Sequence, residues 1–256
     1  MPPLARPLNL KKSLGQHFLK DESVSRRIVD SLKDSSFTQL LEIGPGAGAL
    51  TKYLIQLEQI DFKAVEIDRQ KVAYLKSAYP GLKDRIIELD FLQMEKPFDG
   101  RFTIIGNFPY NISTEILFKI LGWREDVEQV TGMFQKEVAL RIASAEGSRV
   151  YGVTSVLLQA FFEVEYLFEV SEEAFNPPPK VKSAVIRLTP RKTAPAVRTE
   201  KMFFLLVKTA FNQRRKTLRN AVKSLFTEET LQDPLFSRRA EQLKISEFEA
   251  LTWKMK

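Results

Sequence analysis

Short apolar runs alternate with amphipathic segments between Gln39 and Gln135. The apolar runs have the length and composition of strands and lie at Gln39–Ile43, Phe62–Ile67, Arg85–Leu89, Phe102–Gly106 and Val127–Phe134. Between them, apolar residues recur at helical spacing in Ala49–Leu57, Arg69–Ala78 and Ser113–Leu121. This alternation predicts an α/β domain in which a mostly parallel sheet has helices on both faces.

The pattern changes further along the chain. Residues 153–161 have helical spacing, residues 164–170 alternate as in a strand, and Ala184–Leu188 is another apolar run. Strands that follow one another so closely indicate an antiparallel addition to the parallel sheet.

Thr189–Thr199 is rich in Pro, Lys and Arg and has no periodicity, so we interpret it as a linker. Short helices are predicted beyond it at Glu200–Phe211, Arg214–Leu225, Glu228–Leu231 and Ser237–Lys244, with a last turn at Ser246–Leu251. We therefore expect one domain over residues 1–190 and a small, all-helical domain over residues 200–256.

Charge is distributed unevenly. Residues 1–179 carry 21 Lys and Arg against 25 Asp and Glu, a net of −4, whereas residues 180–256 carry 18 against 7, a net of +11. The basic C-terminal third favours a polyanionic partner such as nucleic acid, and a solvated basic surface is the alternative. The chain has no Cys and one His, which excludes thiolate chemistry and argues against a metal site.

Residues 1–12 lack the apolar core of a signal peptide, and no apolar run approaches the roughly 18 residues of a membrane span. We expect a cytoplasmic, monomeric protein that needs no metal and no membrane.

Glycines and acids follow three successive predicted strands. The segment Gly44–Gly48 ends the first strand and opens a helix, as in loops that approach a carboxylate or phosphate closely. Glu66 ends the second strand, where a carboxylate accepts hydrogen bonds from ribose hydroxyls. Asp90 ends the third, where it can accept from an adenine amine while Phe91 packs on the ring. The glycine pattern alone fits a dinucleotide site equally well.

The fourth predicted strand is followed by Asn107-Phe108-Pro109-Tyr110. The exocyclic amine of a nucleobase is a poor nucleophile, because its lone pair is delocalised into the ring. Asn107 Oδ1 and a backbone carbonyl beside Pro109 can accept hydrogen bonds from both N–H groups and favour a pyramidal nitrogen. Tyr110 offers a flat face for the base. A dinucleotide site does not predict this tetrapeptide, whereas an S-adenosylmethionine site does.

With these elements in this order, the chain resembles the ribosomal RNA adenine N6-methyltransferases. This family includes small-subunit RNA dimethyltransferases and macrolide-resistance enzymes that act on large-subunit RNA. The resemblance runs from Lys11 to about Lys223. It implies a class I methyltransferase (Rossmann-like) fold, with S-adenosylmethionine as cofactor and S-adenosylhomocysteine as product. Lys12–Leu19 is similar to the family's N-terminal motif, which closes over the methionine end of the cofactor, although many relatives have Asn in place of His17.

The resemblance also implies roles for individual residues. For the cofactor these are Gln16, His17, Leu19, Gly44, Glu66, Asp90, Phe91 and Asn107. For the target adenine they are Asn107, Phe108, Pro109, Tyr110 and Phe175, with Phe175 stacking on the base opposite Tyr110. For the RNA backbone they are Lys180, Arg214, Arg215, Lys216 and Arg219. Core packing of Phe175 remains an alternative, and Arg215 and Arg219 are expected to share one helix face.

The implied function is dimethylation of N6 at two adjacent adenines in a hairpin near the 3′ end of small-subunit (16S) ribosomal RNA, with the pre-ribosomal small subunit as partner. Three alternatives are a resistance-type methyltransferase of large-subunit RNA, a non-enzymatic assembly factor on the same fold, and an NAD-dependent oxidoreductase. Lys12–Leu19, Phe175–Val181 and Arg214–Arg219 favour the small-subunit enzyme over the resistance type. The intact Asn107–Tyr110 motif argues against a loss of catalysis.

Overall fold

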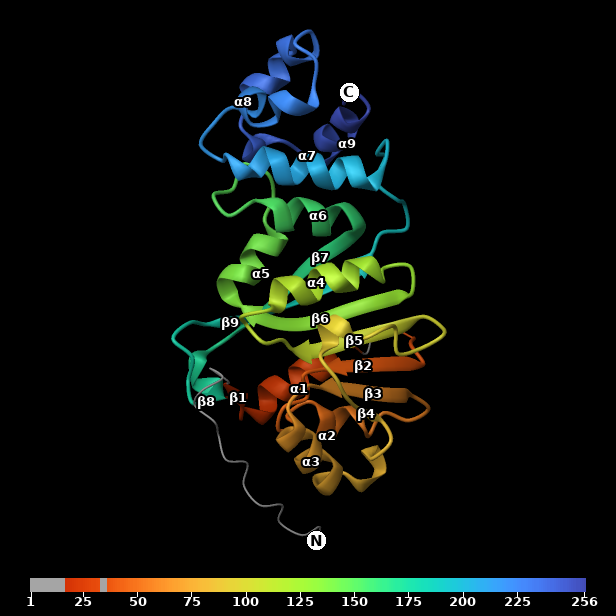
Figure 1. Cartoon of the computed structure of the whole chain (residues 1–256). Helices are drawn as coiled ribbons and strands as arrows, with labels where there is room; N and C mark the ends of the chain where they lie inside the picture. The colour runs from red at the N-terminus through yellow and green to blue at the C-terminus, as the bar shows by residue number, and fades with distance from the viewer. Residues whose placement is uncertain (1–16, 33–35) are drawn as a thin grey trace. The chain divides into compact units, whose positions relative to one another are not determined.

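The computed structural model describes residues 17–32 and 36–256 (Figure 1). These residues form two compact units. The first contains the described residues up to Ala139 together with Glu165–Pro190, and the second contains Leu140–Val164 together with Arg191–Lys256. The units therefore differ from the predicted domains in grouping residues 140–164 with the C-terminal helices.

A seven-stranded sheet is the main framework. Its order is β4-β3-β2-β5-β6-β9-β7, with β2 at Gln39–Ile43, β3 at Asp61–Glu66, β4 at Ile86–Glu88, β5 at Phe102–Asn107, β6 at Val127–Gln135, β7 at Phe162–Val170 and β9 at Ser183–Pro190. Neighbouring strands from β4 to β6 are parallel, and β9 pairs antiparallel with β6. The predicted parallel sheet with an antiparallel addition is confirmed.

The helices of the first unit alternate with these strands. They are α1 at Glu22–Asp30, α2 at Thr51–Leu54, α3 at Arg69–Ala78 and α4 at Ser113–Gly122. Helix α5 at Lys136–Ala143 follows β6 and belongs to the first unit up to Ala139 and to the second unit from Leu140. Asp21 and Asp68 cap α1 and α3 by accepting hydrogen bonds from first-turn amides, which have no partner inside the helix. None of the helices formed by residues 17–32 and 36–256 is long and apolar enough to cross a membrane.

Some elements differ from the sequence-based expectation. The predicted helix at Ala49–Leu57 is shorter in the structure, because residues 46–50 form turns in which Gly46 and Gly48 have positive φ. Helices α1 and α5 were not predicted. Nor were the two-residue strands β1 (Phe18–Leu19) and β8 (Phe175–Asn176), which pair antiparallel with each other. Strands this short leave no periodic pattern in a sequence.

The ring of Phe108 fills a space left by two glycines on neighbouring strands. Gly106 of β5 lies opposite Gly132 of β6. A Cβ added to Gly106 would lie 2.6 Å from both the Phe108 ring and the Ile43 carbonyl oxygen, and one added to Gly132 would lie 2.6 Å from the same ring. Phe134 packs edge-on against Phe108 with 5.0 Å between the ring centroids. The two glycines therefore let the motif residue Phe108 be buried in the core.

The second unit is helical, as predicted for the C-terminal part. It contains α6 at Val153–Phe161, α7 at Glu200–Asn212, α8 at Leu218–Val222 and α9 at Ile245–Thr252, joined partly by short 3₁₀ turns. Aromatic rings pack in its interior: Phe211 lies 6.1 Å from Tyr151 and 6.0 Å from Phe248, between centroids. Phe226 and Phe236 make a second pair at 5.0 Å.

The predicted helix at Arg214–Leu225 is interrupted. Residues 213–217 leave the helical conformation, and α8 begins only at Leu218. The amide of Leu218 donates to the Arg238 carbonyl at 2.7 Å, so a contact distant in sequence sets the start of α8. Arg214–Lys216 thus lie in a turn, and the expectation that Arg215 and Arg219 share a helix face is wrong. The predicted helix at Ser237–Lys244 is also wrong, since this region forms 3₁₀ turns.

We predict that Gly106→Ala destabilises the protein by about 1–3 kcal/mol, the usual cost of overpacking a core, because the carbonyl of Ile43 cannot yield to the new methyl group. Urea unfolding measures this loss. Gly122→Ala is the matched control, since a Cβ there meets no heavy atom within 4 Å and an alanine suits the end of α4. Equal stabilities of the two variants would contradict the account of the Phe108 packing.

Candidate active site

The glycine-rich segment turns sharply after β2. Gly44 and Gly46 have φ values of +68° and +58°, a region that residues with a Cβ rarely adopt. A Cβ added to Gly44 would lie 3.9 Å from Pro109 Cδ. The turn therefore passes beside the Asn107–Tyr110 motif, which follows the neighbouring strand β5.

Glu66, the last residue of β3, is tied to this turn. Its Oε2 accepts a hydrogen bond from the Gly46 amide at 3.2 Å, and its Oε1 accepts one from the Asp68 amide at 3.0 Å. The residue is 5% exposed. A carboxylate has about four lone-pair positions, so each oxygen keeps one for a ligand hydroxyl.

A second carboxyl group, that of Glu42 on β2, is buried near Glu66. Its Oε2 accepts a hydrogen bond from Thr51 Oγ1 at 2.7 Å, which connects β2 to α2 across the glycine turn. Burial, opposed by this hydrogen bond and reinforced by the charge of Glu66, raises the pKa of Glu42 to about 8. Glu42 is therefore mostly neutral at pH 7. Sequence reasoning missed both Glu42 and Thr51, although an acid inside an apolar strand was an available signal.

Asp90 follows β4 and is half-buried. Its Oδ1 accepts a hydrogen bond from the Leu92 amide at 2.9 Å and so caps a 3₁₀ turn. The Leu89 amide donates to the Glu66 carbonyl at 3.2 Å, which brings Asp90 to the same edge of the sheet as Glu66. The adjacent Phe91 is buried, and its ring packs edge-on against Trp123 with 5.3 Å between centroids.

The Asn107–Tyr110 motif leaves the sheet where β5 ends. Asn107 lies opposite Met133 of β6 and is half-buried, whereas Pro109 is exposed. The Phe108 amide donates to the Met133 carbonyl at 3.2 Å, and its ring is held in the core. The amide hydrogen bond and the buried ring of Phe108 together fix the backbone between Asn107 and Pro109.

Tyr110 is held at its hydroxyl group, which is hydrogen-bonded to Ser183 Oγ of β9. Ser183 is fully buried and was not identified from the sequence. The rings of His17 and Tyr110 are stacked, with 6.3 Å between their centroids and 28° between their planes. Burial raises the pKa of Tyr110, while the hydrogen bond with Ser183 acts in the opposite direction. The phenol is therefore protonated at neutral pH.

Phe18 and Leu19, which end the segment similar to the cofactor-closing motif, pair through β1 and β8 with Asn176 and Phe175. His17 Nδ1 donates a hydrogen bond to the Pro177 carbonyl at 2.8 Å, so the side chain of His17 contacts this loop. Leu19 is buried in the core. Gln16, also expected at the cofactor, lies outside the described residues.

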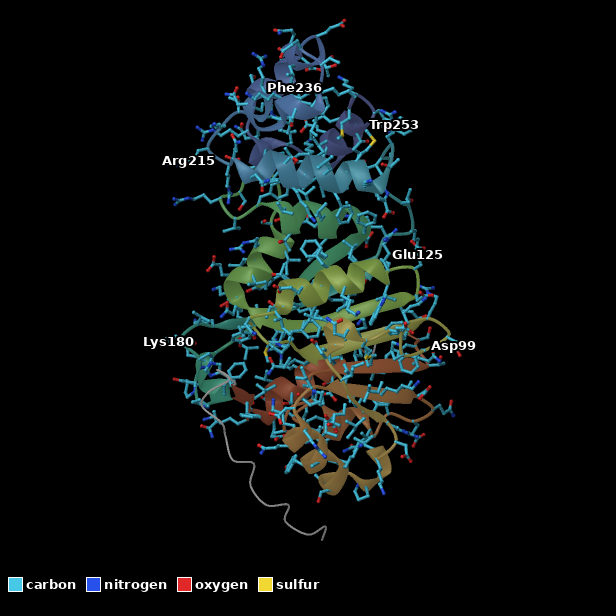
Figure 2. The ribbon with its side chains drawn as sticks, viewed as in Figure 1. Asp99, Glu125, Lys180, Arg215, Phe236 and Trp253 are labelled. Carbon is cyan, nitrogen blue, oxygen red and sulfur yellow. The ribbon has the colours of Figure 1, made fainter. Side chains whose placement is uncertain are left out.

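Phe175 is fully buried and belongs to the same core cluster as Leu19 and Val185. Stacking on a base would require its ring to leave this core. The structure thus favours core packing, the alternative left open for Phe175. Lys180 is exposed in the loop between β8 and β9, where it is accessible to a phosphate (Figure 2).

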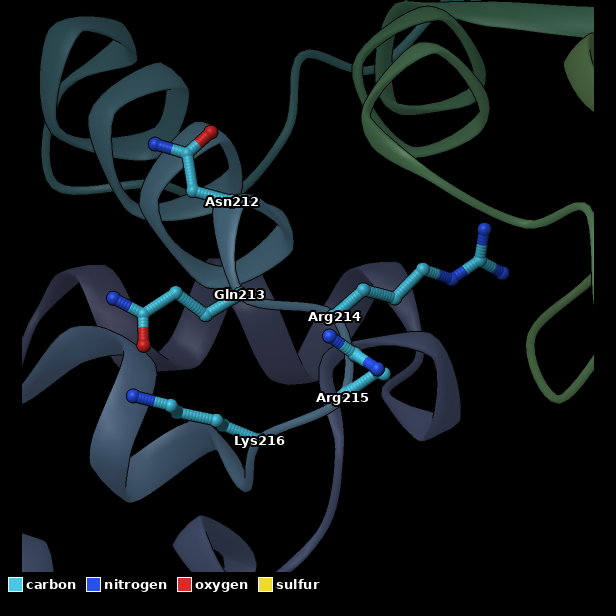
Figure 3. A pocket seen from close by; sticks show the side chains of 5 residues that line it. All are labelled: Asn212, Gln213, Arg214, Arg215 and Lys216. Carbon is cyan, nitrogen blue, oxygen red and sulfur yellow. The ribbon is translucent and has the colours of Figure 1, made fainter.

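The basic run of the second unit lines a hollow of about 460 Å³, formed by Asn212–Lys216 (Figure 3). We call these five residues the basic turn. The side chains of Gln213 and Lys216 extend in the same direction, whereas Arg214 points away from them (Figure 3).

The arginines of this region differ in their contacts. Arg214 Nη2 donates to the Arg149 carbonyl, and Arg219 Nε donates to the Leu231 carbonyl at 3.0 Å. Both guanidinium groups therefore hold backbone segments of the second unit in place. Arg215 is exposed in the same turn as Lys216. In the part of the chain that the structure describes, no group of three His, Asp or Glu could hold a metal ion.

Two solved structures have the same fold. A dimethyladenosine transferase from Plasmodium falciparum has a TM-score of 0.77 and 24% identity, over 91% of this chain and 94% of that one. The 23S rRNA methyltransferase ErmE has a TM-score of 0.68 and 24% identity, over 91% of this chain and 99% of that one. Together with the strand order and the glycine turn, these similarities define a class I methyltransferase fold.

Sequence comparison identifies the family. The family model of ribosomal RNA adenine dimethylase matches residues 8–252. The ribosomal RNA small subunit methyltransferase A of Cytophaga hutchinsonii is 53% identical over 246 residues, which are 94% of this chain and 95% of that protein. The chain belongs to the ribosomal RNA adenine dimethylase family, and the resemblance predicted from its motifs is confirmed.

We predict that Glu42→Gln flattens the dependence of stability on pH. Because the pKa of Glu42 rises from 4.5 to about 8 on folding, the folded protein binds a proton that the unfolded chain releases between these values. The stabilising contribution is complete below about pH 4.5 and is lost by up to about 1.4 kcal/mol per pH unit as pH rises to 8. Unfolding free energies measured from pH 5 to 7.5 test this.

Glu88→Gln is the control for this measurement, because Glu88 is exposed at the end of β4. Its stability curve should run parallel to that of the wild type. If the stability curve of Glu42→Gln also ran parallel to that of the wild type, Glu42 would not be the group that binds a proton on folding.

Proposed function

We propose that this protein transfers methyl groups from S-adenosylmethionine to adenine N6, twice per base, at two adjacent adenines in the hairpin near the 3′ end of small-subunit ribosomal RNA. One observation carries the proposal: the glycine turn, Glu66 and Asp90 meet the Asn107–Tyr110 motif at one edge of the sheet. Membership of the adenine dimethylase family supports the chemistry, and the small-subunit relative at 53% identity supports the substrate. This substrate would place the protein in the cytoplasm.

The residues at the ends of β2, β3 and β4 fit S-adenosylmethionine. Each oxygen of Glu66 has a lone pair left for a ribose hydroxyl after its backbone hydrogen bond. Asp90 uses one oxygen for the Leu92 amide and keeps the other for the adenine amine of the cofactor. The missing Cβ of Gly44 allows a ligand to approach the backbone. When bound, the cofactor supplies a methyl group on a positively charged sulfur.

Asn107 orients the target amine in this proposal. Its Oδ1 and the Phe108 carbonyl accept the two N–H groups, so the nitrogen lone pair is directed at the methyl group. The face of Tyr110 stacks on the base, and the hydrogen bond to Ser183 keeps the ring in position. No residue has to act as a strong base, because the amine becomes acidic once alkylated and its proton can leave to water. Positioning therefore supplies most of the rate enhancement.

The basic turn is the proposed contact with the RNA backbone, together with Lys180. Arg215 and Lys216 are exposed there, in the C-terminal third that carries a net charge of +11. Phosphate contacts of this kind supply affinity and orientation but little sequence discrimination. In this proposal, the Asn107–Tyr110 site of the first unit selects the adenine.

The test uses labelled S-adenosylmethionine and unmethylated small subunits, followed by nucleoside analysis. The wild type should produce N6,N6-dimethyladenosine at two adjacent positions. Asn107→Ala should reduce turnover by about 10²–10³-fold, the usual loss for one preorganised hydrogen bond, while RNA affinity persists. Tyr110→Phe keeps the ring face and loses only the hydrogen bond to Ser183, so its loss of turnover should be smaller than that of Asn107→Ala. Methylation of large subunits instead, or an Asn107→Ala variant of wild-type activity, would refute the proposal.

A second prediction concerns the basic turn. Replacing Arg215 and Lys216 with Ala should weaken RNA binding and lower its salt dependence, by about one unit of logarithmic slope for each phosphate interaction that is removed. Fluorescence titrations at several salt concentrations measure both. Lys192→Ala with Lys201→Ala removes the same charge at exposed positions outside the turn and serves as control. Identical slopes for the two double variants would show that the basic turn is only a solvated surface.

A further inference from the structure

Helix α3 buries a lysine beside the proposed cofactor site. Lys71 is 7% exposed, and its Nζ lies 3.9 Å from Glu66 Oε2. Lysines are almost never buried to this extent unless they are paired with an anion. The sequence pattern did not single out this residue, because it stands in the polar stretch Arg69-Gln70-Lys71 at the start of the helix.

The anion beside Lys71 is one of two carboxyl groups buried close together. Glu42 and Glu66 are 1% and 5% exposed, and the charge of Glu66 contributes to the raised pKa of Glu42. Neighbouring buried carboxyls do not readily ionise together. Glu42 takes the neutral form, stabilised by the hydrogen bond from Thr51. Lys71 therefore faces a single buried negative charge, that of Glu66.

Lys71 also faces the N-terminal strand. Its Nζ lies 5.7 Å from the ring centroid of Phe18 in β1, a distance at which the ring face attracts a cation. The ammonium group thus lies between the carboxylate that ends β3 and the strand that adjoins the site. This placement restricts where the ammonium group can move and keeps it close to Glu66.

We propose that Lys71 is a positioning residue of the cofactor site: its ammonium compensates the buried charge of Glu66 and holds that carboxylate toward the ribose hydroxyls of S-adenosylmethionine. The inference rests on the proposed function, in which Glu66 accepts those hydrogen bonds. Lys71 acts only through Glu66 and does not touch the cofactor. Without the ammonium, the carboxylate of Glu66 would turn toward water, because an uncompensated buried charge is costly.

A double-mutant cycle tests this role. Binding of S-adenosylmethionine to the full-length protein is measured by calorimetry for Lys71→Met, Glu66→Gln and the double variant. Lys71→Met should weaken binding about tenfold, the scale of one charge-assisted contact. In the Glu66→Gln background the same substitution should change the affinity less than about twofold, because no carboxylate remains to be positioned. Lys71→Arg should recover most of the wild-type affinity.

Lys76→Met is the matched control, since it removes the same charge from the same helix and should leave the affinity unchanged. If Lys71→Met does not fold, Lys71→Gln takes its place in the cycle. Wild-type affinity in the Lys71 variant, or equal losses with and without Glu66, would overturn the inference while leaving the role of Glu66 intact. Wild-type affinity in Glu66→Gln would instead overturn the proposed role of Glu66 and this inference with it.

Discussion

The packing of Phe108 against Gly106 and Gly132 is the constraint on which the proposed chemistry depends. An aromatic ring can be buried at the end of β5 only because two paired strands lack side chains at the same place. Burial of this ring anchors a motif whose other residues are half-buried or exposed. Asn107 precedes and Tyr110 follows Phe108 in the sequence, so the anchored Phe108 restricts the positions of both. Their geometry is a property of the core and does not depend on a surface loop.

Electrostatics behind the glycine turn add a second constraint. The structure places two carboxyl groups and one ammonium group where little water reaches them. Glu42 remains neutral, which avoids repulsion between its carboxyl group and that of Glu66. Its hydrogen bond with Thr51 connects β2 to α2. Glu66 then remains the charged carboxylate of the pair, with the Nζ of Lys71 3.9 Å from its Oε2.

Periodicity and strand order account for the parts of the fold that could be predicted from the sequence. Helix α3 has the predicted bounds because Asp68 caps a clear helical pattern, and Glu66, Asp90 and Asn107 converge because parallel strands end at one edge. Contacts between distant segments could not be foreseen in the same way. The turn at residues 213–217 depends on an amide that binds Arg238, and Ser183 meets Tyr110 across 73 positions of sequence. The roles assigned to the site residues stay predictions.

The pairing of β1 with β8 has a consequence for the order in which the fold can be completed. Phe18 and Leu19 find their partners only at Asn176 and Phe175. During synthesis from the N-terminus, at about 5–20 residues per second, β1 therefore has no partner for roughly 8–30 seconds. The parallel strands β2 to β5 are translated well within that interval. Phe18 and Leu19 can therefore reach their final pairing only after β2 to β5 have been synthesised.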